Sequence, residues 1–169
     1  MTDKLPEFVL SRTFSAPRNT VFKAWTDADQ MKQWWGPKGF PVSTATMDLK
    51  PGGSYHYALR SAEGFEMWGK FLYREVAAPE RLVFISTFSN KAGEVTRHPM
   101  VPTWPLHTLS TVTFAEEGTG HTKVTLRGVP ENADALELAT FVTGLEGMRM
   151  AWTATLDQLD AFLAAQTKG

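Results

Sequence analysis

The chain has 169 residues, of which 43% are hydrophobic and 21% are charged, and it carries 17 Lys and Arg against 18 Asp and Glu. This length and composition predict a single globular domain over residues 1–169 and exclude a disordered or fibrous chain. The near-neutral charge lacks the basic stripe of nucleic-acid-binding proteins, and the absence of cysteine excludes disulfides and zinc–thiolate sites.

The N-terminal segment MTDKLPEFVLSRTF does not have the pattern of a targeting signal. It carries Asp3, Pro6 and Glu7 before a short apolar run, whereas a secretory signal has a cationic start and a longer apolar stretch. No stretch of the sequence approaches the roughly 20 apolar residues that cross a bilayer. We therefore expect a cytoplasmic protein without membrane contact.

The first part of the chain predicts one strand and two short helices. Apolar and polar residues alternate over Glu7–Phe14, which is typical of a strand. The period then becomes helical, and Ser15 is a candidate helix cap. A second helix is expected after Thr26 or Asp27, either of which can cap it, and it should end at Gly36-Pro37.

Four extended runs follow and predict an antiparallel meander. They cover residues 41–49, 54–60, 65–76 and 80–88. Pro99, Pro102 and Pro105 remove backbone donors, so we expect no regular structure in the segment 89–108. A hairpin is expected over residues 109–129, where two strands rich in Thr and Val flank the turn EEGTG.

From residue 130 onward the sequence predicts one long helix, for which Asn132 is a candidate cap. Its apolar positions recur at intervals of three and four and form one stripe. They are Leu138, Phe141, Leu145, Met148, Trp152, Leu156, Leu159 and Leu163. Gly144 and Gly147 each cost a helix about 1 kcal/mol relative to Ala, so we expect a close approach by another backbone or an open space there.

This order of elements predicts an α+β fold of the helix-grip type. A curved antiparallel sheet of about six strands should wrap around the long C-terminal helix, with the two short helices after the first strand. The stripe on the last helix needs an apolar partner of comparable length, and the sheet is the element that offers one.

Several stretches resemble the activator-of-Hsp90-ATPase-homologue-like family, a bacterial group in the START-like (SRPBCC, Bet v 1-type) superfamily. They are FSAPRNTVFKAWTDADQMKQWWGPKGF, DLKPGGSYHY, PERLVF and LSTVTFAEEGTGHTKVTLR. The resemblance extends from about Glu7 to Leu163. It implies a cavity between the sheet and the long helix, which the superfamily uses for lipids, aromatics and polyketides. It does not imply one activity.

Catalytic and metal-binding patterns are scarce in this sequence. No two of the four histidines have the i, i+4 spacing of a helical metal site, so we expect no metal and no cofactor. Glu66 could act as a general base if it were buried beside Trp68, but strand alternation favours its facing solvent. His107 could face the mouth of a pocket. The sequence thus favours a protein without catalytic machinery.

Large apolar side chains are the best candidates for a binding site, because ligand pockets are mostly apolar with few polar groups. We expect one of Trp34 and Trp35 to anchor the corner before Gly36-Pro37 to the core and the other to face a cavity. Trp104 should lie over its mouth. The predicted lining residues are Trp35, Tyr55, Tyr57, Phe84, Phe88, Trp104, Phe141, Leu145, Met148 and Trp152.

The main hypothesis is therefore a protein that binds a small hydrophobic or aromatic molecule. One alternative is a protein-interaction module like the co-chaperone after which the family is named. The near-neutral charge and the lack of the partner-binding domain of the eukaryotic co-chaperones disfavour it. A second alternative is an enzyme of the cyclase or hydratase type. Edge strands and the apolar residues Met100, Val101 and Trp104 could also support a homodimer.

Overall fold

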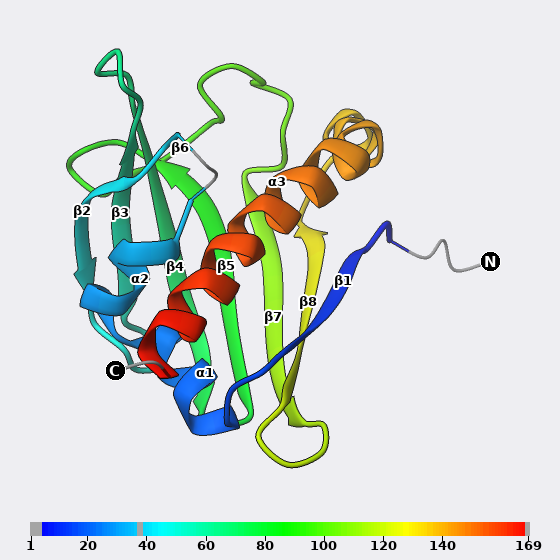
Figure 1. Ribbon diagram of the computed structural model, residues 1–169. Coiled ribbons are helices and arrows are strands. Elements are labelled where there is room, and N and C mark those ends of the chain that lie inside the picture. Colours follow the sequence, from blue (N-terminus) through cyan, green and yellow to red (C-terminus); the bar gives the residue numbers. More distant parts are fainter. Residues whose placement is uncertain (1–4, 37–38, 168–169) are drawn as a thin grey trace.

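A computed structural model describes residues 5–36 and 39–167 and confirms the α+β helix-grip fold (Figure 1). In chain order the elements are β1 (Phe8–Phe14), α1 (Arg18–Thr26), α2 (Ala28–Trp34), β2 (Val42–Met47), β3 (Ser54–Arg60), β4 (Glu66–Ala77), β5 (Arg81–Ser89), β6 (Val95–Thr96), β7 (His107–Glu116), β8 (Thr122–Glu131) and α3 (Ala135–Thr167). Pro37, at the predicted end of the second helix, lies outside the described residues.

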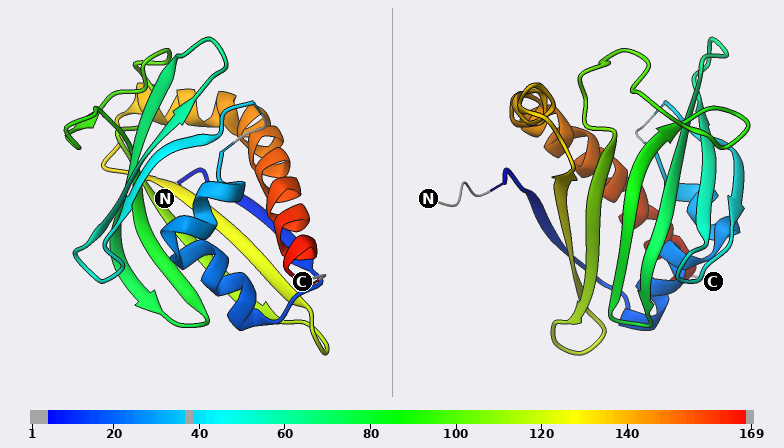
Figure 2. Two further views of the ribbon diagram at one scale, coloured as in Figure 1. Left: turned by 60° about the vertical axis from the view of Figure 1, so that its left-hand side comes forward. Right: turned by 180° about the vertical axis from the view of Figure 1, so that it is seen from behind.

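One antiparallel sheet contains all the strands of the described residues, in the order β1-β8-β7-β5-β4-β3-β2, with β6 paired to the end of β5. It has eight strands rather than about six. One reason is that β1 pairs with β8 along its whole length. The other is β6, a two-residue strand within the segment for which the prolines predicted no regular structure. The sheet curves, and α3 lies on its concave side (Figure 2).

Of the caps predicted for the two short helices, the one for α2 is found and the one for α1 is not. Asp27 caps α2, because its carboxylate accepts the Gln30 N–H at 3.1 Å. The prediction that Ser15 caps α1 is wrong, since Pro17 occupies the N-cap position. Pro17 has no side-chain acceptor, and its carbonyl instead accepts the Val21 N–H at 3.0 Å.

The two tryptophans at the end of α2 occupy different places in the corner that follows this helix. Trp34 is 1% exposed, its indole N–H donates to the Ala24 carbonyl at 3.0 Å, and its ring meets Trp25 edge-on at 4.9 Å. Trp35 is the C-cap residue, and Gly36 follows it with a φ of +98°, which glycine adopts without strain. Trp34 therefore fixes the corner to the core.

The two halves of α3 are buried to different degrees. In the second half, Leu156, Leu159 and Leu163 are at most 2% exposed, and this half packs beside α1 and α2. In the first half, Phe141 is fully buried, but Leu145 and Met148 of the same stripe are only half-buried. The first half of α3 thus covers the sheet without filling the space above it.

A bend separates these halves, visible in Figure 2 where the yellow-orange part of α3 meets the red part. Gly144 and Gly147 lie near this bend, and glycine is a common cause of such bends. The bend lets the second half pack against α1 and α2 while the first half turns along the sheet.

Candidate functional site

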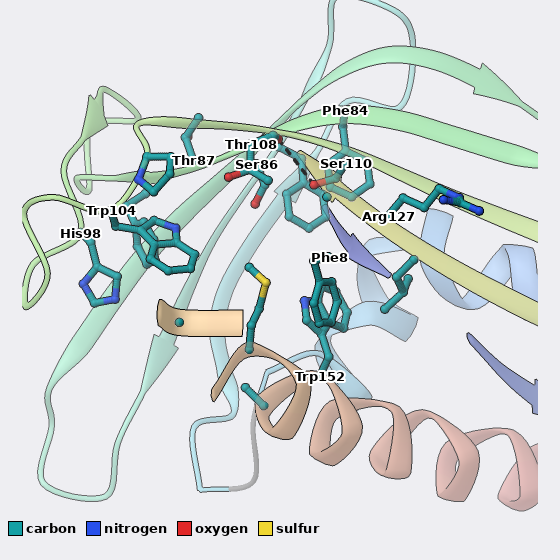
Figure 3. A pocket seen from close by; sticks show the side chains of 18 of the residues that line it. Phe8, Phe84, Ser86, Thr87, His98, Trp104, Thr108, Ser110, Arg127 and Trp152 are labelled. Carbon is teal, nitrogen blue, oxygen red and sulfur yellow. Dashed lines mark hydrogen bonds between the residues drawn. The ribbon is translucent and has the colours of Figure 1, made fainter. Parts of the chain in front are cut away.

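A cavity of about 390 Å³ lies between the first half of α3 and the concave face of β5, β7 and β8 (Figure 3). Its walls are mainly aromatic and apolar. Among the residues that line it are Phe8, Tyr57, Phe71, Phe84, Phe88, Val101, Trp104, Met148 and Trp152. Its volume falls within the range of about 300–1,000 Å³ typical of small-molecule sites.

The structure brings most of the sequence-predicted lining residues to this space. Tyr57, Phe84, Phe88, Trp104, Met148 and Trp152 line the cavity. Trp35 lines an adjoining pocket of about 270 Å³, which shares Tyr57, Phe88 and Trp152 with the first. The other three lie outside the lining of both: Tyr55 and Phe141 are fully buried in the core, and Leu145 packs against it.

Trp152 and Tyr57 form the wall between the cavity and the adjoining pocket. The Trp35 ring meets Trp152 at 5.1 Å and Tyr57 at 5.7 Å, in both cases edge-on. Burial raises the pKa of Tyr57 to about 12, and the nearby Trp35 indole N–H partly opposes this shift. The raised pKa keeps Tyr57 a neutral phenol near neutral pH. The Trp35 N–H does not reach hydrogen-bonding geometry with any described residue and so is an unused donor beside it.

Trp104 closes the end of the cavity near the start of α3. It belongs to the segment of residues 97–106, which we call the flap. Its ring lies 5.5 Å from that of Phe141, and a Cβ added to Gly144 would come within 2.7 Å of it. Gly144 therefore provides room for an indole ring rather than for another backbone. Gly147 has nothing within 4 Å of its added Cβ.

A buried carboxylate holds the flap against the first turn of α3. Glu137 is 7% exposed and accepts hydrogen bonds from the Arg97 guanidinium at 2.5 Å and from the Leu106 N–H at 3.3 Å. It also forms a capping box with Asp134: the Glu137 N–H donates to the Asp134 carboxylate at 2.8 Å, and the Asp134 N–H donates to Glu137 at 3.0 Å.

The capping box corrects the sequence prediction of the helix start. Asp134 caps α3, whereas Asn132, the predicted cap, has a left-handed φ of +54° in the turn before it. The Asp134 backbone N–H, followed by the Arg97 guanidinium, keeps the pKa of Glu137 below its usual value. Glu137 is thus ionised near neutral pH and links flap and helix.

Polar side chains also line the cavity, and they are not among the residues predicted from the sequence. Ser86 on β5 is the register partner of Thr108 on β7, and Ser110 lies two residues further along β7. The alternation of β5 could have revealed Ser86, because it has the same parity as Phe84 and Phe88. These three hydroxyl-bearing residues face the apolar side of α3 (Figure 3).

His98 also lines the cavity, from the flap, and it is not among the residues predicted from the sequence. Its Nδ1 accepts the backbone N–H groups of Met100 at 3.0 Å and Val101 at 3.1 Å. Its ring packs on Phe88 with centroids 4.5 Å apart. Burial lowers the pKa of His98, so the neutral ring carries its proton on Nε2.

Comparison with known proteins places this chain in a family. Residues 15–164 match the family described as "Activator of Hsp90 ATPase homolog 1-like protein". The chain belongs to this family. Among curated proteins, none matches the chain.

Solved structures similar to this family member come from several bacteria. A protein from Arthrobacter aurescens is 24% identical with a TM-score of 0.79, and the match covers 94% of this chain and 86% of that one. A protein from Nitrosomonas europaea is 21% identical with a TM-score of 0.76 and full coverage of both chains. A Staphylococcus epidermidis protein is 29% identical with a TM-score of 0.73, covering 98% and 93%.

The two candidate catalytic residues of this activator-of-Hsp90-ATPase-homologue-like protein lie outside the lining of the cavity. Glu66 is exposed at the start of β4, where it is the register partner of Arg60. His107 is half-buried at the start of β7 opposite Glu131. Within residues 5–36 and 39–167, no three His, Cys, Asp or Glu side chains gather closely enough to hold a metal ion. Over the same ranges, no helix has the length and hydropathy to span a membrane.

Proposed function

We propose that this protein binds a small, predominantly apolar or aromatic molecule in the cavity between the sheet and the first half of α3. The observation that carries the proposal is the unequal burial of the α3 stripe. Leu156 and Leu159 pack fully into the core, but Met148 and Trp152 line an open volume of about 390 Å³. An apolar ligand would complete the packing that the chain leaves unfinished there.

Burial of apolar surface sets the affinity expected for a simple ligand. A bicyclic aromatic compound buries about 150–250 Å² of surface, which at about 25 cal/mol per Å² yields roughly 4–6 kcal/mol before the cost of association. Specific polar contacts add to this value. The apolar term alone corresponds to dissociation constants between about 1 mM and 40 μM, and the cost of association weakens binding further unless polar contacts offset it.

The test uses N-phenyl-1-naphthylamine, an uncharged dye whose fluorescence rises in apolar surroundings. We expect saturable binding of one dye per chain. Ala151 lines both the cavity and the adjoining pocket, so Ala151→Phe should fill this space and weaken binding at least tenfold. Thr153→Phe is the matched control: Thr153 is exposed on the same helix, as Ala151 is, but it lines neither pocket, so this change should leave binding unchanged.

Circular dichroism of both variants would confirm that they fold. The proposal fails if the dye does not bind, or if folded Ala151→Phe binds it as well as the control does.

A protein-partner function is the second candidate, and the family match favours it. Exposed apolar side chains on the flap and on the outer face of α3 could contact a chaperone: Met100, Leu136, Val142 and Met150 are 52–70% exposed. Stimulation of a purified chaperone ATPase by the protein would support this reading over ligand binding. Catalysis by Glu66 or His107 has no such support, because neither residue lines the cavity.

A homodimer and a cytoplasmic location also stay predictions. β1 and β2 are the outer strands of the sheet and could pair with a second copy. Of the flap residues expected to support a dimer, Met100 is 68% exposed, whereas Val101 and Trp104 line the cavity. Sedimentation of the protein at high micromolar concentration tests the homodimer, and a purely monomeric profile would reject it.

A further inference from the structure

The sheet side of the cavity carries a compact group of hydroxyls, which we call the hydroxyl patch: Ser86, Thr108 and Ser110. Directly paired residues on antiparallel strands have Cβ atoms about 4.5–5.5 Å apart, and residues two apart on one strand lie roughly 7 Å apart. Ser86 and Thr108 are such a pair, and Ser110 follows Thr108 by two residues. One ligand oxygen can therefore contact two of these hydroxyls at once.

The protein leaves most of the hydrogen-bonding capacity of the patch unused. Among the described residues, the Ser86 and Thr108 hydroxyls have no hydrogen-bond partner, and Ser110 makes one long bond to the Thr108 carbonyl, at 3.5 Å. In contrast, the hydroxyl of Thr87, which also lines the cavity, donates to the Lys70 carbonyl at 3.3 Å. The hydroxyls of the patch are thus available to a ligand, whereas the Thr87 hydroxyl is already engaged.

No ionised group faces this patch from the cavity walls that the structure describes. The lining residues include no carboxylate and no lysine. Arg127 lines the rim, but its guanidinium extends away from the cavity and pairs with Glu7 at 3.2 Å (Figure 3). His98 accepts two backbone N–H groups at Nδ1, an arrangement that suits its neutral form. An anionic ligand group would lose its water here without gaining a counter-charge.

We infer that the cavity selects an uncharged ligand whose carbonyl or hydroxyl group hydrogen-bonds to the hydroxyl patch, and that it discriminates against the carboxylate of the same skeleton. This inference rests on the proposed function and specifies its ligand class. A neutral hydroxyl patch can both donate to a carbonyl and accept from a hydroxyl, but it cannot balance a negative charge.

Three probes of nearly the same shape test the inference: 2-acetylnaphthalene, 2-ethylnaphthalene and 2-naphthoate. They place a ketone, an ethyl group and a carboxylate at the same position of one ring system. We expect the ketone to bind about two- to tenfold more tightly than the ethyl compound, which corresponds to one hydrogen bond. The carboxylate should bind at least tenfold more weakly than the ketone.

The double variant Ser86→Ala/Ser110→Ala leaves one hydroxyl of the patch, that of Thr108, and should lower the affinity ratio of ketone to ethyl compound toward one. Thr113→Ala is the matched control, since Thr113 lies on β7 with the opposite parity and is absent from the cavity lining. It should keep the ratio of the wild-type protein. Dissociation constants would come from ligand-observed NMR.

The outcomes separate the two proposals. Equal binding of the ketone and ethyl compounds, a carboxylate that binds as tightly as the ketone, or a ratio unaffected by the double variant would overturn the inference while leaving apolar binding in place. Failure of all three probes and of N-phenyl-1-naphthylamine to bind would overturn both.

Discussion

The two glycines of α3 offer a sharp test of how the flap packs. Replacing a glycine by alanine inside a helix stabilises it by about 1 kcal/mol, if the new methyl group has room. At Gly147 nothing lies within 4 Å of the added Cβ, so Gly147→Ala should show this full gain. At Gly144 the added Cβ would lie 2.7 Å from the Trp104 ring, so the indole must move away from its place beside Phe141.

Forcing an extra methyl group into a packed contact costs about 1–3 kcal/mol, which offsets the helix gain. We therefore expect Gly144→Ala to change the free energy of unfolding by between about 0 and −2 kcal/mol. Gly147→Ala should raise it by about 1 kcal/mol, or 2–4 °C in Tm for a chain of this size. Chemical denaturation measures both values.

A double-mutant cycle tests whether Trp104 causes the difference in stability between Gly144→Ala and Gly147→Ala. In a Trp104→Ala background the clash is gone, so Gly144→Ala should gain about 1 kcal/mol, as Gly147→Ala does. If Gly144→Ala in the otherwise unaltered protein stabilises as much as Gly147→Ala, the indole does not pack on the helix, and the description of the flap is wrong.

Three further predictions concern the core, the flap and the cavity wall. Leu159 is fully buried, so Leu159→Ala should lower the free energy of unfolding by about 2–5 kcal/mol in urea titrations; a loss below about 1 kcal/mol would contradict its place in the core. The lowered pKa of Glu137 stabilises the fold above the unfolded value near 4.3, and this contribution disappears as the pH falls further. The Tm difference between wild type and Glu137→Gln should therefore narrow from pH 7 to pH 3, whereas a constant difference would refute the ionised contact. Tyr57 should ionise only near pH 12 in the folded protein, so subtracting the absorbance titration of Tyr57→Phe from that of wild type should show no phenolate at pH 10.

Local sequence patterns were sufficient to predict most of the fold. Alternation predicted β1, extended runs joined by turns predicted β2 to β5, Thr- and Val-rich runs around the turn EEGTG predicted β7 and β8, and the intervals of three and four in α3 predicted a helix with one apolar stripe. β6 was not predicted, because a two-residue strand is too short to show a period. The cap of α3 was misplaced because both Asn132 and Asp134 are good cap residues and the spacing was not used: Glu137 follows Asp134 by three residues, as in a capping box, whereas Ala135 follows Asn132.

The lining of the cavity could be predicted only in part. Aromatic residues on inward-facing strand positions, such as Phe84 and Phe88, follow from alternation once the helix side of the sheet is known. Tyr55 has the same parity as Tyr57 yet is fully buried, because depth along a strand is set by tertiary packing. His98 was overlooked for a similar reason: a histidine directly before Pro99, in a segment without regular structure, has no period, and its place depends on the path of the flap.

Two methionines on α3 provide the most direct test of the central claim, which is that a small apolar molecule binds between α3 and the sheet. Met148 lines the cavity, whereas Met150, two residues further on, is 70% exposed. The measurement is a titration of 13C-methyl-methionine-labelled protein with N-phenyl-1-naphthylamine, followed by NMR. We predict that the methyl signal of Met148 shifts until one equivalent is bound while that of Met150 stays in place. An unchanged Met148 signal, or equal shifts at both methionines, would contradict the claim.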